Sequence, residues 1–256
     1  MEVCDLAEPD CTCGGHCLQR LWGQMTPDQT DPLPPMAAWH WEQMYPPYRR
    51  YNSPATIVIV ATTIAVFFVQ LYFHYFYHSE WVANLLAFSP ETFEEGDYWR
   101  IVTYAWIHSE ELPIHILFNM LMVWALGGEI ERILGSVRFL ILYFGGVIAA
   151  ALVFWMWSPF DSEAVAGASG AAFALLTSLA VLCPTRRLNV LLLLVIPMRM
   201  KVVTLAWVTC AVELVCQIFG FLGFISHTAH LGGALFGVAL TFLLKPKRPK
   251  PMVFPN

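Results

Sequence analysis

Long apolar segments alternate with short charged ones along this chain, and their lengths predict membrane-spanning helices. A helix needs roughly 20 residues to cross the ~30 Å hydrocarbon layer of a bilayer. Six segments approach that length, and we expect them to form one bundle. They span about residues 56–76, 113–131, 137–157, 168–183, 202–220 and 228–244.

A shorter apolar stretch, Leu188 to Ile196, does not fit this series. It is about nine residues long, it stops at Pro197, and basic residues flank it on both sides. So short a segment cannot span the hydrocarbon layer, and proline interrupts it. The pattern predicts a re-entrant or interfacial loop rather than a seventh span.

Composition supports an integral, multi-pass membrane protein. The 256 residues are 57% hydrophobic and only 13% charged, and their mean hydropathy is +0.57. That leaves too little polar surface to cover a soluble globule of this size. We therefore expect an all-α polytopic protein in a lipid bilayer, with no nucleic-acid partner and no cofactor.

The basic residues predict the orientation. Twelve of the 14 Lys and Arg fall in segments that alternation assigns to the same face as both termini, and the positive-inside rule makes that face cytoplasmic. They are Arg49, Arg50, Arg132, Arg138, Arg186, Arg187, Arg199, Lys201, Lys245, Lys247, Arg248 and Lys250.

The regions outside the spans predict three parts: a cytoplasmic tail at 1–55, a helical domain at 56–245 and a basic tail at 246–256. Residues 1–55 lack the apolar core of a cleavable signal peptide. Their first part groups five potential metal ligands, although the spacing is not a standard zinc motif and the thiols could simply be reduced. These residues are Cys4, Cys11, Cys13, His16 and Cys17.

Four polar side chains capable of catalysis fall in the first turns of three helices that all run from outside to inside. The i, i+4 spacing puts His115 and Asn119 on one helix face. Ser169 and His230 start two other helices, and they meet only if those helices pack. Neutral histidine can take the proton of a serine hydroxyl and return it to a leaving amine, so the pattern predicts acyl transfer by Ser169 and His230.

The remaining parts of such a site can also be assigned. His115, Asn119 and the Ser169 backbone N–H would stabilise the oxyanion of the tetrahedral intermediate. Small residues on both helices would let their backbones approach. These small residues include Gly167, Gly170, Gly233 and Gly237.

Each of these polar residues also has a structural interpretation. Ser169, His230, His115 and Asn119 could all be packing or hydrogen-bonding residues of a helix bundle. His227 is the reserve candidate for the base, and His108 is expected to hydrogen-bond in a loop. No acidic third member of the dyad is evident. Glu213, inside an expected span, is either functional or a hydrogen-bonded structural residue, and we do not assign it to the dyad.

The chain resembles the rhomboid intramembrane serine proteases over nearly all of residues 50 to 245, and three motifs carry this resemblance. Two further features, Trp99-Arg100 and Glu129-Ile-Glu131-Arg132-x-x-Gly135, are similar to structural features of that family. The three motifs are His115-x-x-x-Asn119, Gly167-Ala168-Ser169-Gly170 and Ala229-His230-Leu-Gly-Gly233-x-x-x-Gly237.

The resemblance implies a six-helix bundle with a short, sunken serine-bearing fourth helix. A six-span core without an extra helix resembles bacterial forms and some secretory-pathway forms of the family, so a bacterial cytoplasmic membrane is expected, with a eukaryotic secretory-pathway membrane as the alternative. It also implies a serine and histidine dyad without aspartate, an oxyanion site helped by His115 and Asn119, and single-span or polytopic membrane proteins as substrates, cut near their outer ends. Two other functions remain as alternatives: a catalytically idle relative that binds transmembrane segments, and a transporter or channel. The intact motifs disfavour the first, and the lack of a repeat disfavours the second.

Overall fold

The computed structural model describes residues 53–157, 164–192, 196–222 and 226–244. All of them belong to the unit that runs from Trp41 to Asn256. The cysteine-rich segment and the basic C-terminal tail lie outside the described residues. The metal-site hypothesis and the boundaries of the expected domains therefore stay predictions.

Most of the described chain is helical, as the apolar pattern predicted. Five of its helical segments are long and apolar enough to cross a membrane, judged by length and composition. This confirms an all-α polytopic fold, whereas the expected number of six spans stays a prediction. The five are α3 (Pro54–Tyr77), the segment Pro113–Leu134, α9 (Ser136–Trp157), α11 (Val202–Phe219) and α12 (His227–Leu244).

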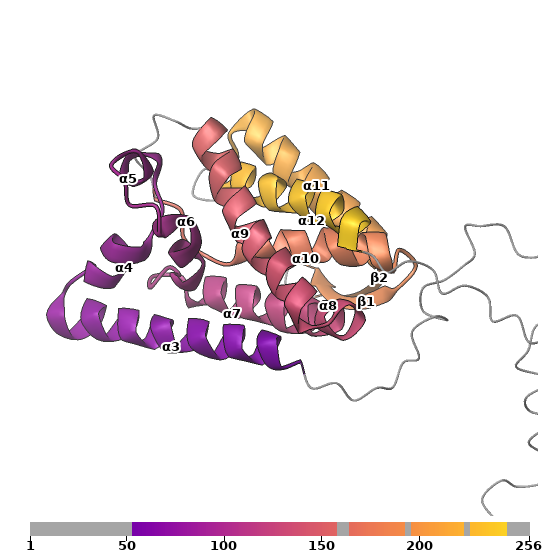
Figure 1. The fold of residues 1–256 in the computed structure, drawn as a ribbon, viewed down its shortest axis with the longest axis horizontal. Coiled ribbons are helices and arrows are strands. Elements are labelled where there is room, and N and C mark those ends of the chain that lie inside the picture. The colour runs from indigo at the N-terminus through magenta and orange to yellow at the C-terminus, as the bar shows by residue number, and fades with distance from the viewer. Residues whose placement is uncertain (1–52, 158–163, 193–195, 223–225, 245–256) are drawn as a thin grey trace, which may run out of the picture. The chain divides into compact units, whose positions relative to one another are not determined.

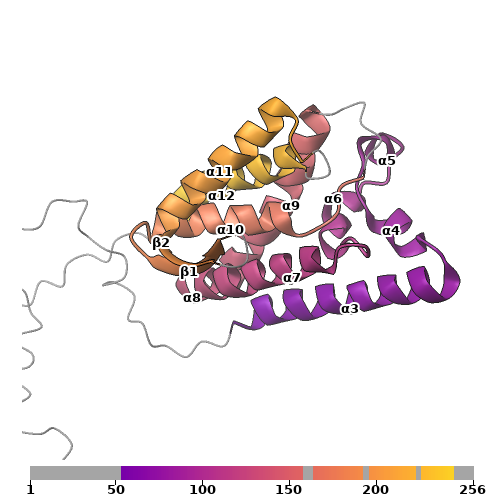
Figure 2. The ribbon, with the colours of Figure 1, turned by 180° about the vertical axis from the view of Figure 1, so that it is seen from behind.

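The remaining expected span, residues 168–183, is the fourth along the chain and forms the short helix α10 (Ser169–Leu182), which has 14 residues. At 1.5 Å per residue it is ~21 Å long, less than the hydrocarbon layer. It lies between α9, α12 and the helices of the second span (Figure 1, Figure 2). Every residue from Gly170 to Ala180 is buried, so neighbouring helices rather than lipid cover this apolar helix on all sides.

The second span is not a regular helix. Helix α7 (Pro113–Met122) begins with proline, and a π-helical turn at Val123–Gly127 joins it to α8 (Gly128–Leu134). Proline suits the first helical turn because the N–H that it lacks has no partner there. A π-turn shifts the side chains that follow it around the helix axis.

Four short helices lie between α3 and α7, where the apolar pattern predicted only a loop. The first of them, α4, follows α3 after a short turn (Figure 1). Ser89 and Thr92 form a capping box at the start of α5, a device that stabilises even a short helix. The four are α4 (Trp81–Leu86), α5 (Pro90–Glu94), α6 (Arg100–Thr103) and the 3₁₀-helix η2 (Tyr104–Trp106).

The expected re-entrant or interfacial loop contains a β-hairpin, which departs from the all-helical expectation. Strand β1 (Arg187–Leu192) pairs antiparallel with β2 (Ile196–Lys201). The register sets Arg187 opposite Lys201 and Leu192 opposite Ile196. A hairpin satisfies the backbone groups of a segment that is too short for a spanning helix.

Glu131, in the family-like run that leaves the second span, ties α8 to the start of α3. Its carboxylate accepts hydrogen bonds from the backbone N–H groups of Ala55 (3.0 Å) and Thr56 (2.9 Å) and from the Ser136 hydroxyl (2.6 Å). The first N–H groups of a helix have no partner within it, and a negative charge there is favourable. A distant carboxylate thus caps α3.

Candidate active site

Ser169 and His230 meet at the N-terminal ends of α10 and α12. The Ser169 Oγ lies 2.6 Å from His230 Nε2. The His230 ring stacks on Phe173 of α10, with ring centroids 4.6 Å apart and planes 13° from parallel. Since Phe173 is buried, it restricts the orientation of the imidazole. A hydroxyl within hydrogen-bond distance of an imidazole nitrogen is the arrangement that activates a serine.

Glycines allow α10 and α12 to pack this closely. A Cβ on Gly233 would lie 2.0 Å from the backbone O of Gly170, and one on Gly237 would lie 2.2 Å from the backbone O of Ala174. Hydrogen bonds add to the contact: the Thr177 hydroxyl donates to Ala234 O at 2.9 Å. Close backbone contact through small residues is a general way of packing helices in membranes.

The segment before Ser169 is held by backbone hydrogen bonds to the chain between α3 and α7. Val165 and Phe88 exchange two such bonds, of 2.7 and 3.2 Å, and the Gly167 N–H donates to Tyr104 O at 3.0 Å. Gly167 has φ = +115°, a conformation that other L-residues rarely adopt. The segment between α3 and α7, whose short helices the apolar pattern missed, therefore helps to set where α10 begins.

His115 and Asn119 lie directly beside this segment. A Cβ on Gly167 would stand 3.1 Å from His115 Nε2 and 3.8 Å from Asn119 Nδ2. The Asn119 Nδ2 donates to the backbone O of His115 at 2.9 Å, which leaves a second amide proton. The Asn119 Oδ1 is buried and has no hydrogen-bond partner among the described residues. Such unsatisfied buried groups are uncommon, and they point to a functional site.

Trp99 and Arg100 contact residues between α3 and α7 rather than the dyad. The Trp99 Nε1–H donates to Leu85 O at 3.3 Å. The Arg100 guanidinium donates to Asp97 at 2.7 Å, to Ala87 O at 3.2 Å and to Asn84 O. Arginine can serve several acceptors at once because its five N–H groups form a planar fork. These contacts fasten the end of α4 to the start of α6.

The structure corrects the expectation that no acid lies near the dyad. The Glu213 Oε1 is 3.0 Å from His230 Nδ1, and its Oε2 is 2.5 Å from His227 Nδ1. His227 also has its Nε2 2.9 Å from the backbone O of Phe221. Both nitrogens of His227 are thus engaged elsewhere, and His230, rather than the reserve candidate His227, contacts Ser169. The carboxylate was missed because two different helices bring the three side chains together.

His108 lies in the loop between η2 and α7, and it is fully buried. Its backbone N–H and C=O both bond to the side chain of Gln70, at 3.2 and 2.9 Å. Burial and, to a smaller extent, the neighbouring His115 imidazole lower the pKa of His108 to about 3. Taking an imidazolium out of water is costly, so the buried ring stays neutral.

We therefore expect His108 to make the protein acid-sensitive. The unfolded chain binds this proton near pH ~6.5, whereas the folded chain binds it only near pH 3. Stability is present above about pH 6.5 and is lost as the pH falls toward 3, at up to ~1.4 kcal/mol per pH unit. Thermal unfolding in detergent at pH 7.5, 6.5 and 5.5 should show a steeper decline for the parent than for His108→Gln. Equal declines would contradict this.

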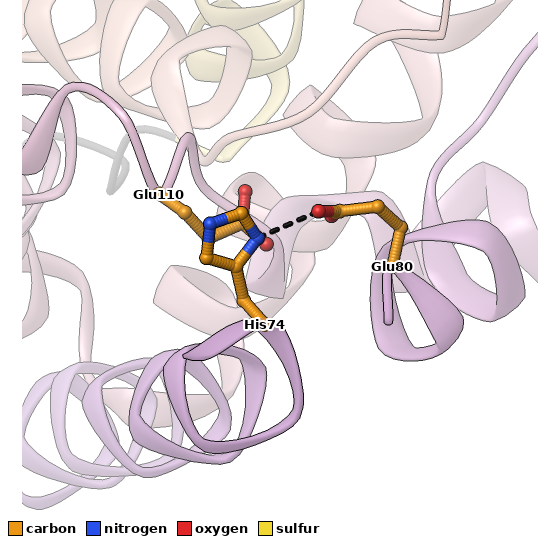
Figure 3. Close-up of side chains that lie close together, drawn as sticks. All are labelled: His74, Glu80 and Glu110. Atoms are coloured by element: carbon orange, nitrogen blue, oxygen red, sulfur yellow. Dashed lines mark hydrogen bonds and ion pairs between the residues drawn. The ribbon is translucent and has the colours of Figure 1, made fainter. Parts of the chain in front are cut away.

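A second polar cluster, outside the dyad, joins α3, the start of α4 and the loop before α7 (Figure 3). Its members, His74, Glu80 and Glu110, are the one group in the described ranges whose ligand atoms lie close enough to hold a metal ion. His74 Nδ1 already pairs with Glu80 at 2.6 Å, and Glu110 accepts from Gln70 at 2.5 Å. Because each member has a protein partner and all are partly exposed, the cluster does not require a metal.

Comparison with known proteins gives consistent matches. Residues 95–247 match the family model of the rhomboid domain. The rhomboid protease GlpG of Pectobacterium atrosepticum is 29% identical over 227 residues, which are 84% of this chain and 75% of that protein. The rhomboid protease GluP of Bacillus subtilis is 30% identical over 144 residues, 56% of this chain and 25% of that protein. GlpG of Yersinia pestis is 26% identical over 209 residues, 77% and 68% of the two chains.

Proposed function

This chain belongs to the rhomboid family of intramembrane serine proteases, and from that premise we propose that it cleaves membrane-spanning substrates through Ser169 and His230. Membership makes it an integral membrane enzyme whose substrates are transmembrane proteins. The observation that carries the assignment of the dyad is the 2.6 Å contact between Ser169 Oγ and His230 Nε2.

The reaction begins with attack of the serine on the scissile carbonyl carbon. His230 Nε2 accepts the hydroxyl proton as the Oγ–C bond forms, and the carbonyl oxygen becomes an oxyanion. The C–N bond then breaks, and His230 returns the proton to the leaving amine. Water attacks the acyl-enzyme by the same proton route and releases the new carboxyl terminus together with free Ser169.

The oxyanion would be stabilised by donors around Gly167. Asn119 retains one amide proton beyond its bond to His115 O, and the Ser169 backbone N–H is free of the helical ladder because α10 begins there. The imidazole of His115 faces the same space. Preorganised donors of this kind often contribute the largest part of catalysis in acyl transfer.

Two reagents test the proposal directly. The purified protein in liposomes, incubated with a single-span model substrate, should give two products whose new ends map near the outer end of the substrate helix. A fluorophosphonate, which reacts with activated serines, should modify Ser169, and mass spectrometry of the digested protein identifies the site. A folded protein that captures the substrate without cutting it or reacting would instead support the idle, helix-binding alternative.

Asn119→Ala is expected to lower kcat by roughly 10²- to 10³-fold, because it removes an oxyanion donor. KM should change little, since the donor acts mainly in the transition state. Steady-state cleavage of the model substrate measures both constants. Asn84→Ala is the matched control, because its side chain is exposed and only its backbone oxygen contacts Arg100. Equal kcat values for the Asn119 variant and the parent would remove Asn119 from the site.

We also propose that both termini are cytoplasmic and that the dyad opens to the outer side of a bacterial cytoplasmic membrane. The distribution of basic residues supports this orientation, and the relatives above are bacterial. A eukaryotic secretory-pathway membrane remains the alternative. Reporter fusions that fluoresce only in the cytoplasm, placed at each terminus, test the orientation.

A further inference from the structure

Three side chains from two helices form a polar group that includes the dyad histidine. Glu213 comes from α11, and His227 and His230 come from α12. Their side chains are 14%, 5% and 12% exposed. A carboxylate this well covered and in contact with two imidazoles is not a solvated surface charge, and a buried ionisable group in a membrane protein points to function.

The proton count in this group can be worked out. The Phe221 carbonyl only accepts hydrogen bonds, so His227 Nε2, 2.9 Å away, carries a proton. His227 Nδ1 faces Glu213 Oε2 at 2.5 Å, and one proton lies between these two atoms. Either His227 is an imidazolium beside a carboxylate, or a neutral His227 accepts from a carboxylic acid. In both cases Oε1 of Glu213 remains an acceptor.

That free oxygen is the one that faces the dyad histidine. Oε1 lies 3.0 Å from His230 Nδ1. The ring N–H does not point squarely at it, so Nδ1 makes no hydrogen bond among the described residues. Hydrogen bonds of catalytic groups are often poorly aligned without substrate and improve in the complex. A small rotation of the His230 imidazole, which keeps its stack on Phe173, would align the Nδ1–H with Glu213 Oε1.

We propose that Glu213 is a positioning residue for His230, an inference that rests on the proposed function. By accepting from Nδ1–H, it holds the tautomer whose Nε2 is unprotonated and can take the proton from Ser169. It also stabilises the imidazolium that forms during attack. Acids in soluble serine proteases play this part. The resemblance to the family implied a serine and histidine dyad without aspartate, and the acid beside His230 in this chain is a glutamate.

The competing interpretation is that Glu213 only ties α11 to α12 through His227. Two isosteric variants separate these roles, Glu213→Gln and the control Glu131→Gln. Glu131 is also a buried carboxylate, but its partners are the start of α3 and Ser136. A structural carboxylate should change the unfolding temperature without changing kcat per folded molecule, and a positioning carboxylate should change kcat.

The test measures kcat, KM, the rate of fluorophosphonate labelling and the unfolding temperature of the full-length protein. In Glu213→Gln we expect kcat and the labelling rate to fall together, by at least about 10-fold and at most ~10⁴-fold, the loss seen for the acid of soluble triads. KM should stay within a few-fold of the parent. Glu213→Asp, which keeps the charge on a shorter side chain, should recover part of kcat. Glu131→Gln should lower only the unfolding temperature.

Three outcomes would overturn the inference. The first is a Glu213→Gln protein with parental kcat and labelling rate. The second is a loss of activity that merely follows the folded fraction, as a structural role predicts. The third is a folded parent that neither cleaves nor labels more than Ser169→Ala does, a result that rejects the proposed function itself and is therefore distinguishable from the other two.

Discussion

Ser169→Ala is expected to abolish cleavage while the protein stays folded. The variant lacks the Oγ that would form the acyl-enzyme and that contacts His230 at 2.6 Å. In soluble serine proteases, loss of the serine or the histidine costs about 10⁶-fold in kcat, and such a loss would leave no measurable product here. Cleavage of the single-span substrate in liposomes, normalised to folded protein, measures it.

His230→Ala should have an effect of the same size, because the two residues act as one unit and their losses do not add. Ser178→Ala is the matched control for the serine: Ser178 lies on the same helix, is buried, and accepts a hydrogen bond from Thr241 at 2.7 Å. It should retain kcat and lose only a little stability. An active His230→Ala protein would return His227 to consideration as the base.

Gly233→Ala is expected to destabilise the bundle and to separate the dyad. The added Cβ would lie 2.0 Å from the backbone O of Gly170, 2.7 Å from its carbonyl carbon and 3.1 Å from its Cα. Backbone atoms cannot rotate away, so α10 and α12 must move apart. Overpacking of this kind typically costs about 1–3 kcal/mol, and this site should reach the upper end. The helices that separate are those that carry Ser169 and His230.

Gly128→Ala controls for the loss of a helical glycine. The nearest atom to its added Cβ would be Ser53 Oγ, at 3.6 Å, so the change should be neutral or stabilise the protein by up to about 1 kcal/mol. Thermal unfolding and cleavage rate in detergent report both effects. If Gly233→Ala unfolded at the parental temperature with parental activity, the close packing of α10 on α12 would be wrong.

The pattern of apolar segments predicted the class of fold well, because the bilayer dictates the length and hydropathy of a spanning helix. The family that the motifs implied is confirmed by the match over residues 95–247. The catalytic roles of Ser169, His230, His115 and Asn119, the count of six spans and the orientation stay predictions. The motifs pointed to the polar residues, whereas their spacing alone did not show that they meet.

Features that depend on irregular or local structure escaped the sequence. The short helices α4 to α6 are held by contacts such as those of Arg100 with the backbone oxygens of Asn84 and Ala87, which have no periodic pattern. The hairpin of Arg187–Leu192 and Ile196–Lys201 arises from a short apolar run, whose periodicity alone does not identify a strand. The π-turn at Val123–Gly127 likewise has no signal in hydropathy.

The sequence by itself determined that this chain spans a membrane, that it belongs to a family of serine proteases and which serine and histidine carry the motifs. The tertiary structure alone decided that Glu213 stands beside His230 and that His227 is engaged with Glu213 and Phe221 rather than with Ser169. The reason is physical. Burial of long apolar segments is a property of each segment, whereas a contact between side chains of α11 and α12 depends on how far each helix is rotated and shifted against its neighbour.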